Sequence, residues 1–238
     1  MKRFSLLTRA SLRYFLLIIP VFIGVCTSAQ QKNRVFLLRG VTEVPLPDTP
    51  YHICATYIFS HKPEIITTAQ LDGKGSFQFN NIITTSLGKG KVIILGSSEY
   101  FSELMLKKSN TRKLLQNMVL WGSLKKTAKI QLWVPSEALQ QFFEKQHFSI
   151  VSNGGNTIDP STNILFLTKD VVDSINMKGI EMFVRRGGTL IFGSPFAEMF
   201  KENPQGYPSL HLNDLFLKAG VYHDINPFAF QKKNSTGK

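Results

Sequence analysis

The fold is decided by an apolar run between two glycine-marked turns, GKGKVIILGSSEYFS, at residues 88–102. The β-branched and aliphatic residues over 91–96 have the composition of a buried strand. Glycine and lysine alternate over 88–91, which favours a solvated turn into that strand. The apolar run stops at Ser97 and Ser98, so we expect a central strand that ends in a polar loop.

Downstream of this strand, strand-like and helix-like patterns alternate. Further strands are expected over residues 130–134, 149–152, 164–168 and 189–193, and helices over 111–121, 136–146, 170–185 and 213–218. Such alternation predicts a mostly parallel sheet with helices on both faces. Two earlier β-branched runs, at 51–60 and 76–85, predict an N-terminal antiparallel β extension. The fold class is therefore α/β.

The helix expected over 170–185 has recognisable end signals. Asp170 suits its N-cap. Arg185 and Arg186 lie at the negative end of the helix dipole, and the glycine pair at 187–188 suits the left-handed turn that follows. We therefore interpret these charges as structural.

Residues 1–29 have the composition of a secretory signal peptide. Four basic residues precede an apolar run over 14–25, and small residues at 27–29 supply a cleavage site. A signal anchor is the alternative, but the run contains Pro20 and is shorter than the roughly 20 residues needed to span a bilayer. We therefore expect cleavage near Ala29 and a secreted or extracellular protein.

The rest of the chain divides into three parts. Residues 30–50 carry three prolines after an apolar segment, which favours a linker or an extended edge. Residues 51–225 contain the α/β region, and residues 226–238 form a polar tail. Asn234 begins an Asn-Ser-Thr glycosylation pattern in this tail, which has meaning only in a eukaryotic secretory pathway.

The charge of the chain favours an anionic surface as partner without naming one. Removing the four basic residues of the signal peptide lowers the formal net charge from +12 to +8. Lys and Arg are scattered in pairs and there is no zinc-finger spacing, so no nucleic-acid partner is expected. No second apolar run of spanning length follows, so no integral membrane segment is expected in the mature chain.

Ligands of open parallel sheets bind beyond the carboxyl ends of the strands. The candidate binding residues are therefore the polar ones that follow the expected strands: Ser97, Ser98, Glu99, Lys169, Asp170 and Ser194. This set contains no cysteine.

Ser98, Asp170 and His211 also occur in the chain order of an α/β-hydrolase triad, so they are candidate catalytic residues of a serine hydrolase. That chemistry needs a strained G-x-S-x-G elbow, and residues 96–100 lack its second glycine. Serines that bind the backbone at the end of a strand are the simpler interpretation.

No metal or cofactor is indicated. The five histidines have no ligand spacing and no H-E-x-x-H occurs. The turn at 88–91 precedes a strand, whereas a phosphate-binding loop follows a strand and opens a helix. Cys54 lies in an apolar run, where burial should raise the thiol pKa and keep it inert.

Four segments, taken in order, resemble one family: LGKGKVIILGSSEYF, NTRKLLQNMVLWGS, IEMFVRRGGTLIFGS and YPSLHLNDLFLKAGV. They are similar to the amidotransferase-like domain of the TRP channel-associated factors and their enhancin-like metallopeptidase relatives. The shared features are the glycine and lysine turn at 88–91, the Asn117 to Trp121 spacing, and the basic helix end before the glycines at 187–188. The match covers residues 51–222.

This resemblance implies a flavodoxin-like three-layer sandwich related to class I glutamine amidotransferases, but not their activity. Those enzymes place a cysteine nucleophile on a strand-to-helix elbow, and the comparable strand ends here hold Ser97, Lys169 or Ser194. The zinc peptidase of the larger relatives lies downstream, beyond the point that corresponds to Lys238. Residues 193–196 depart from the family, which commonly has glutamine and tryptophan there.

We therefore expect a secreted, non-catalytic amidotransferase-like domain that binds a protein or a glycan, with no cofactor. One alternative is the serine hydrolase described above. The other is a channel-regulating interaction protein, as in the TRP channel-associated factors, whose partner would be a membrane protein.

Overall fold

The computed structural model describes residues 32–47, 53–70, 78–123, 127–134, 136–151, 157–169, 174–195 and 210–224. Its centre is a seven-stranded sheet in the order β2-β3-β4-β8-β7-β5-β6. The strands are β2 (Glu64–Gln70), β3 (Gln78–Leu87), β4 (Gly90–Leu95), β5 (Lys129–Trp133), β6 (Ser149–Val151), β7 (Ile164–Leu167) and β8 (Thr189–Gly193). The strands from β4 to β6 in this order are parallel, and β2, β3 and β4 pair antiparallel.

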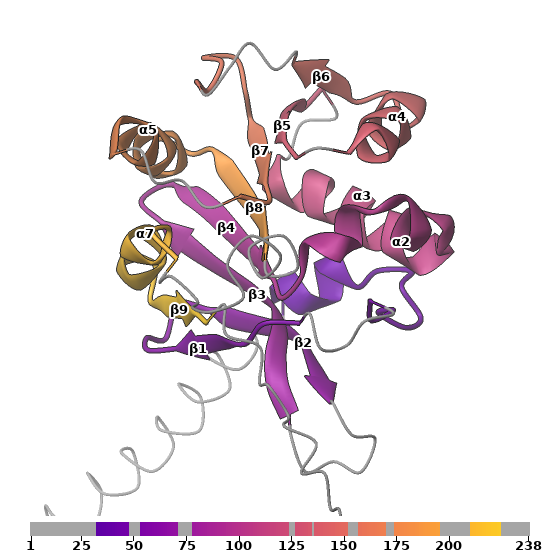
Figure 1. The fold of residues 1–238 in the computed structure, drawn as a ribbon, viewed down its shortest axis with the longest axis horizontal. Coiled ribbons are helices and arrows are strands. Elements are labelled where there is room, and N and C mark those ends of the chain that lie inside the picture. Colours follow the sequence, from indigo (N-terminus) through magenta and orange to yellow (C-terminus); the bar gives the residue numbers. More distant parts are fainter. Residues whose placement is uncertain are drawn as a thin grey trace, which may run out of the picture.

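Helices cover both faces of this sheet, as Figure 1 shows. They are η2 (Ser98–Phe101), α2 (Glu103–Lys107), α3 (Ser109–Gly122), α4 (Glu137–Lys145), α5 (Ser174–Arg185) and α7 (Asn213–Lys218). Buried residues of α2, α3 and α4 pack on one face, and those of α5 and α7 pack on the other. The predicted α/β fold, a three-layer sandwich with a mostly parallel sheet, is confirmed. None of the helices in the described ranges combines the length and the apolar character of a membrane span.

The order of the parallel strands resembles that of flavodoxin. Read from the other edge it is β6-β5-β7-β8-β4, which matches the order 2-1-3-4-5 except that the last position holds the first parallel strand of the chain. The helix that follows β5 packs on one face, and the helix that follows β7 packs on the other. The topological switch point therefore lies between the carboxyl ends of β5 and β7.

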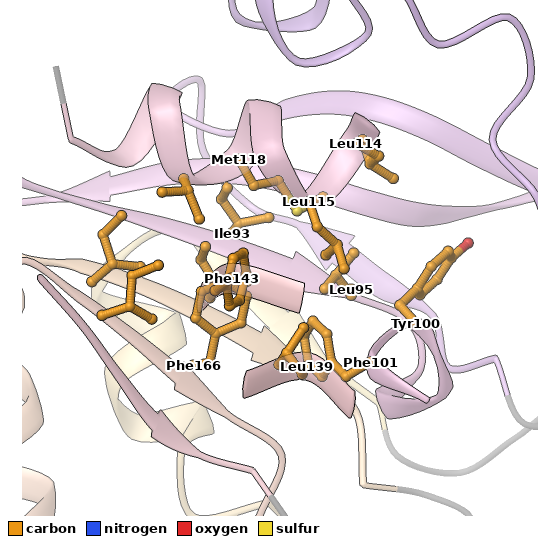
Figure 2. Packing of buried hydrophobic residues seen from close by; sticks show 14 of the residues in the cluster. Ile93, Leu95, Tyr100, Phe101, Leu114, Leu115, Met118, Leu139, Phe143 and Phe166 are labelled. Carbon is orange, nitrogen blue, oxygen red and sulfur yellow. The ribbon is translucent and has the colours of Figure 1, made fainter. Parts of the chain in front are cut away.

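The central strand β4 is buried on both faces, which explains its unbroken apolar run. Ile93 and Leu95 face the α3 side, whereas Val92 and Ile94 face the α5 side. Figure 2 shows the α3 side, where Leu114, Leu115 and Met118 pack with Phe143 and Phe166. All these side chains are fully buried.

The first described segment corrects the expectation of a linker or extended edge over 30–50. Residues 32–37 are helical and Leu37 is fully buried. Asn117 of α3 donates from Nδ2 to the carbonyl oxygens of Leu37, at 2.9 Å, and Arg39, at 2.8 Å. The prolines of this region come after the helix, so they did not prevent it from forming.

The antiparallel part is larger than expected and is divided. β2 was not predicted, and β1 (Thr56–Ile58) does not pair with β3. It pairs instead with β9 (Val221–His223), a short strand near the other end of the chain, to form a separate two-stranded sheet. Pairing between three-residue strands so distant in sequence leaves no local pattern that could predict it.

Three of the four segments that carried the family resemblance meet at the amino end of β4. Gly88 has a φ of 63°, the positive value that a two-residue hairpin with glycine first requires. Lys89 and Lys91 donate their amides to the carbonyl oxygens of Arg185 and Gly188, both at 3.1 Å. A Cβ on Gly90 would overlap the carbonyl oxygens of Val184 and Gly188.

Trp121 completes this contact from the other face of the sheet. Its side chain is 9% exposed, and its indole nitrogen donates to Asn33 Oδ1 at 3.0 Å. The Lys91 ammonium lies 4.6 Å from the centre of the ring and also donates to the Trp121 carbonyl oxygen. Arg185, at the end of α5, contacts Glu181 at 2.8 Å, in keeping with a structural role for its charge.

A buried histidine joins the two-stranded sheet to α7. His223 Nδ1 lies 2.9 Å from Thr56 Oγ1, and its backbone exchanges two 2.9 Å hydrogen bonds with the Asn213 side chain. Burial lowers the pKa of His223 to about 3. Its Nε2 has no hydrogen-bond partner among the described residues.

We predict that Gly90→Ala destabilises the protein by at least about 3 kcal/mol, because its methyl group would collide with backbone atoms that cannot move independently. Gly179→Ala is the matched control: a Cβ there has nothing within 4 Å, so the helix should gain up to about 1 kcal/mol. Urea unfolding of both variants measures the difference. Equal stability of Gly90→Ala and wild type would contradict the close contact.

We also predict acid destabilisation through His223. The folded-state pKa of about 3 lies below the usual 6.5, so the unfolded chain takes up a proton first as the pH falls. The stability should therefore fall below pH 6.5, by up to about 1.4 kcal/mol per pH unit from this group alone. Thermal melts between pH 7 and 4.5 should show a shallower decline in His223→Gln than in wild type. His61→Gln, which changes an exposed ring, is the control, and parallel profiles for wild type and His223→Gln would refute the assignment.

Candidate functional site

The carboxyl ends of β4 and β8 bring three of the predicted serines to one edge of the sheet. Leu95 and Gly193 are paired at this end. The Ser194 amide donates to the Leu95 carbonyl oxygen at 3.1 Å, and the Ser98 amide donates to the Ser194 carbonyl oxygen at 2.8 Å. Main-chain hydrogen bonds therefore hold the two strand-end loops against each other.

Ser97 has a structural role at this edge. Its side chain is buried, and its hydroxyl accepts a hydrogen bond from the Glu99 amide at 3.1 Å as the N-cap of η2. Glu99, which is half-buried, lies in the first turn of η2, where a carboxylate is favoured by the helix amides. The hydroxyl of Ser97 is thus directed to the backbone of its own turn.

The helix η2 fills the space above the strand ends. Tyr100 and Phe101 are buried, and the Tyr100 hydroxyl accepts a hydrogen bond from Asn81 Nδ2 at 2.8 Å. A Cβ on Gly193 would lie 2.6 Å from the Phe101 ring and 3.0 Å from the Ser98 Cα. The end of β8 therefore passes directly beneath η2.

The structure places a cysteine at this edge, where the strand-end residues alone indicated none. The Cys54 amide donates to the Gly96 carbonyl oxygen at 2.7 Å, so the segment before β1 crosses the end of β4. Burial raises the pKa of the Cys54 thiol to about 12, and the negative charge of Asp224 adds to this shift. The thiol is thus protonated, as predicted. Its position was missed because Cys54 precedes the α/β region.

The candidate triad of Ser98, Asp170 and His211 stays a prediction, and the structure describes two of its three residues. Ser98 begins η2, whose Tyr100 and Phe101 pack on the α3 face of the sheet. His211 lies in an exposed turn before α7, which packs on the opposite face. Asp170 lies outside the described residues. No three His, Cys, Asp or Glu side chains within the described ranges come together as a metal site would need.

Lys169 lies at the switch point between β5 and β7. It is separated from β7 by Thr168, and its ammonium is 5.8 Å from the centre of the Trp133 ring. Trp133 is the last residue of β5 and is paired with Leu167 of β7. The carboxyl ends of these strands therefore present an aromatic ring and a cation beside each other.

An open groove extends from Trp133 along the α5 face of the sheet. It lies between α5 and the segment 157–163, and its cavity volume is about 610 Å³. Gly179 and Phe183 line it on the helix side, and Asp159 lines it on the segment side. The groove was not predicted, because most of its lining comes from the segment before β7 and from α5, and not from residues that follow the strands.

No family model and no curated protein matches this chain. Solved structures of one metallopeptidase share its fold. IMPa metallopeptidase from Pseudomonas aeruginosa aligns over 83% of this chain with a TM-score of 0.58 and 10% identity. IMPa metallopeptidase in complex with T-antigen, and IMPa from Pseudomonas aeruginosa in complex with an O-glycopeptide, each align over 84% with a TM-score of 0.57, at 10% and 9% identity.

The chain spans 22% of the length of each of these IMPa chains. At such low identity the similarity concerns the fold alone. The expected resemblance to enhancin-like metallopeptidases is therefore confirmed at the level of the fold, and the relation to TRP channel-associated factors and to class I amidotransferases stays a prediction.

Proposed function

We propose that this chain is a secreted, non-catalytic domain that binds a protein or a glycan. The observation that carries the proposal is the contrast between its two candidate sites. At the strand-end edge, where a related enzyme would hold its nucleophile, η2 packs closely on the end of β8, whereas the groove beside the switch point is open. The groove is therefore the better candidate for a ligand.

The absence of catalysis is supported by the state of each candidate nucleophile. Ser97 caps η2, Ser194 is 1% exposed, and the Cys54 thiol has a pKa of about 12. An enzyme nucleophile must reach its substrate and must be activated by a base or by a lowered pKa. The serine hydrolase alternative loses support because Ser98 and His211 belong to elements that pack on opposite faces.

The proposed ligand class is supported by what the structural neighbours contain. IMPa has been solved with T-antigen and with an O-glycopeptide, so a protein that includes this fold encounters glycosylated polypeptides. This chain spans 22% of IMPa, and a part of that size can contribute recognition without the peptidase chemistry. The signal-like residues 1–29 are consistent with export to where glycoproteins occur.

We predict that the purified protein releases no ammonia from glutamine, cleaves neither mucin nor casein, and is not labelled by a fluorophosphonate. Cys54 should react with a thiol reagent only after unfolding, because the folded chain buries it. Mass spectrometry of probe-treated native and urea-unfolded protein measures both results. Labelling at Ser98 that disappears in His211→Ala would establish the hydrolase alternative instead.

We predict saturable binding of the protein to an immobilised mucin-type glycoprotein, measured by biolayer interferometry. The same glycoprotein after enzymatic removal of its glycans is the matched control. Loss of binding after deglycosylation assigns recognition to the glycan, and retention assigns it to the polypeptide. No binding to either form, or to a panel of other glycoproteins, would contradict the proposed function.

A further inference from the structure

One wall of the groove beside α5 is fixed in place by a buried side chain. Gln131 of β5 is 1% exposed and donates from Nε2 to the Thr157 carbonyl oxygen at 2.9 Å. Its Oε1 accepts from the Asp159 amide and from Thr162 Oγ1, both at 3.0 Å. A wall held by three hydrogen bonds needs little ordering when a ligand arrives, and such preorganisation favours affinity.

The charged group on this wall is also oriented in advance. The Asp159 carboxylate accepts hydrogen bonds from the Ser161 amide at 2.7 Å and the Ser161 hydroxyl at 2.6 Å. Both bonds go to Oδ1, so they fix the plane of the carboxylate while Oδ2 can accept from a ligand. Asn163 ends the segment, and its Oδ1 accepts from the Lys129 amide at 3.0 Å.

The opposite wall is one face of α5, where Gly179 and Phe183 lie four residues apart, and it continues to Arg186 just after the helix. A Cβ on Gly179 would have nothing within 4 Å, so the absence of a side chain at this position widens the groove. Glycine within a helix is unfavourable relative to alanine. An open space beside a helical glycine is consistent with a groove that is kept clear for a ligand.

Trp133 lines the end of the groove and carries a buried donor without an acceptor. The residue is 7% exposed, and its indole N–H makes no hydrogen bond within the part of the chain that the structure describes. Buried polar groups of folded proteins almost always have a partner. The nitrogen itself has less than 1 Å² of accessible surface, so a ligand in the groove would contact the ring of Trp133 and not its N–H.

The chemistry of the lining selects the class of ligand. It offers an acceptor in Asp159, a donor in the exposed Arg186, and the aromatic surfaces of Trp133 and Phe183. Hydroxyl groups both donate and accept, and a sugar ring also has apolar C–H faces. Opposite charges on the two walls do not favour an anion or a cation. We infer that the groove between α5 and residues 157–163 binds a neutral saccharide.

This inference rests on the proposed function and narrows it to a ligand and a place. The test is binding to an array of neutral oligosaccharides, sialylated oligosaccharides and unglycosylated peptides. Wild-type protein should bind neutral oligosaccharides, and Gly179→Leu should reduce that binding at least tenfold by filling the open space. Lys178→Leu introduces the same residue at the neighbouring exposed position, which does not line the groove, and should leave binding unchanged. Thermal melts of both variants confirm folding.

A second variant tests the oriented carboxylate. Asp159→Ala removes this acceptor from the wall of the groove, so the affinity for the same oligosaccharides should fall about tenfold. If Gly179→Leu and Asp159→Ala bind the saccharides as wild type does, a glycan-binding function stands but the groove is not its site.

The remaining outcomes separate the inference from the proposed function. If wild type binds only peptides, the inference of a saccharide ligand is wrong and the protein-binding alternative of the proposed function stands. If wild type binds sialylated oligosaccharides selectively, the inference that the saccharide is neutral is wrong. No binding to any member of the array, together with no binding to glycoproteins, overturns both.

Discussion

The contact between the β3–β4 hairpin and the end of α5 is the constraint on which the rest of the structure depends. Lys89 and Lys91 donate to carbonyl oxygens at the end of α5, and only glycine fits at position 90 against them. This contact sets the distance between α5 and the central strand. It also places Lys91 where its ammonium contacts Trp121 on the opposite helical layer. One edge of β4 thereby ties all three layers together.

Three of the four segments that identify the family resemblance therefore build the scaffold. The glycine and lysine turn, Trp121 and the glycines at 187–188 lie at the amino end of the parallel strands. The turn at 88–91 and Trp121 are not among the residues that line the groove beside α5, so stability explains these two motifs, whereas Gly188 both accepts a hydrogen bond from Lys91 and lines the groove. These contacts concern the fold, and the fold is what this chain shares with IMPa at about 10% identity.

Local patterns were sufficient to predict the parallel strands and the helices α3, α4, α5 and α7, but η2 and α2 were not predicted. β4, β5, β7 and β8 are apolar runs bounded by glycine or polar residues, and Ser136 caps α4 where a helix start was expected. Long-range contacts were not predictable in this way. β9 has three residues and gains its stability from β1 and from Asn213, both of which lie outside its own sequence pattern. The helix at 32–37 depends equally on two hydrogen bonds from Asn117, about eighty positions further along the chain.

The candidate site shows the same division, because its polar strand ends were predicted and its open space was not. A serine after a strand can be read from the sequence, but whether a helix such as η2 covers it depends on packing. Glycine is the most instructive case. Gly90 is required by backbone atoms that touch it, whereas Gly179 has nothing near it, although both appear in the sequence as one letter. A helical glycine that packing does not require adds only flexibility to a scaffold. The presence of Gly179 is explained if a ligand occupies the empty volume beside it, which is bounded on the other side by the wall that Gln131 holds in place.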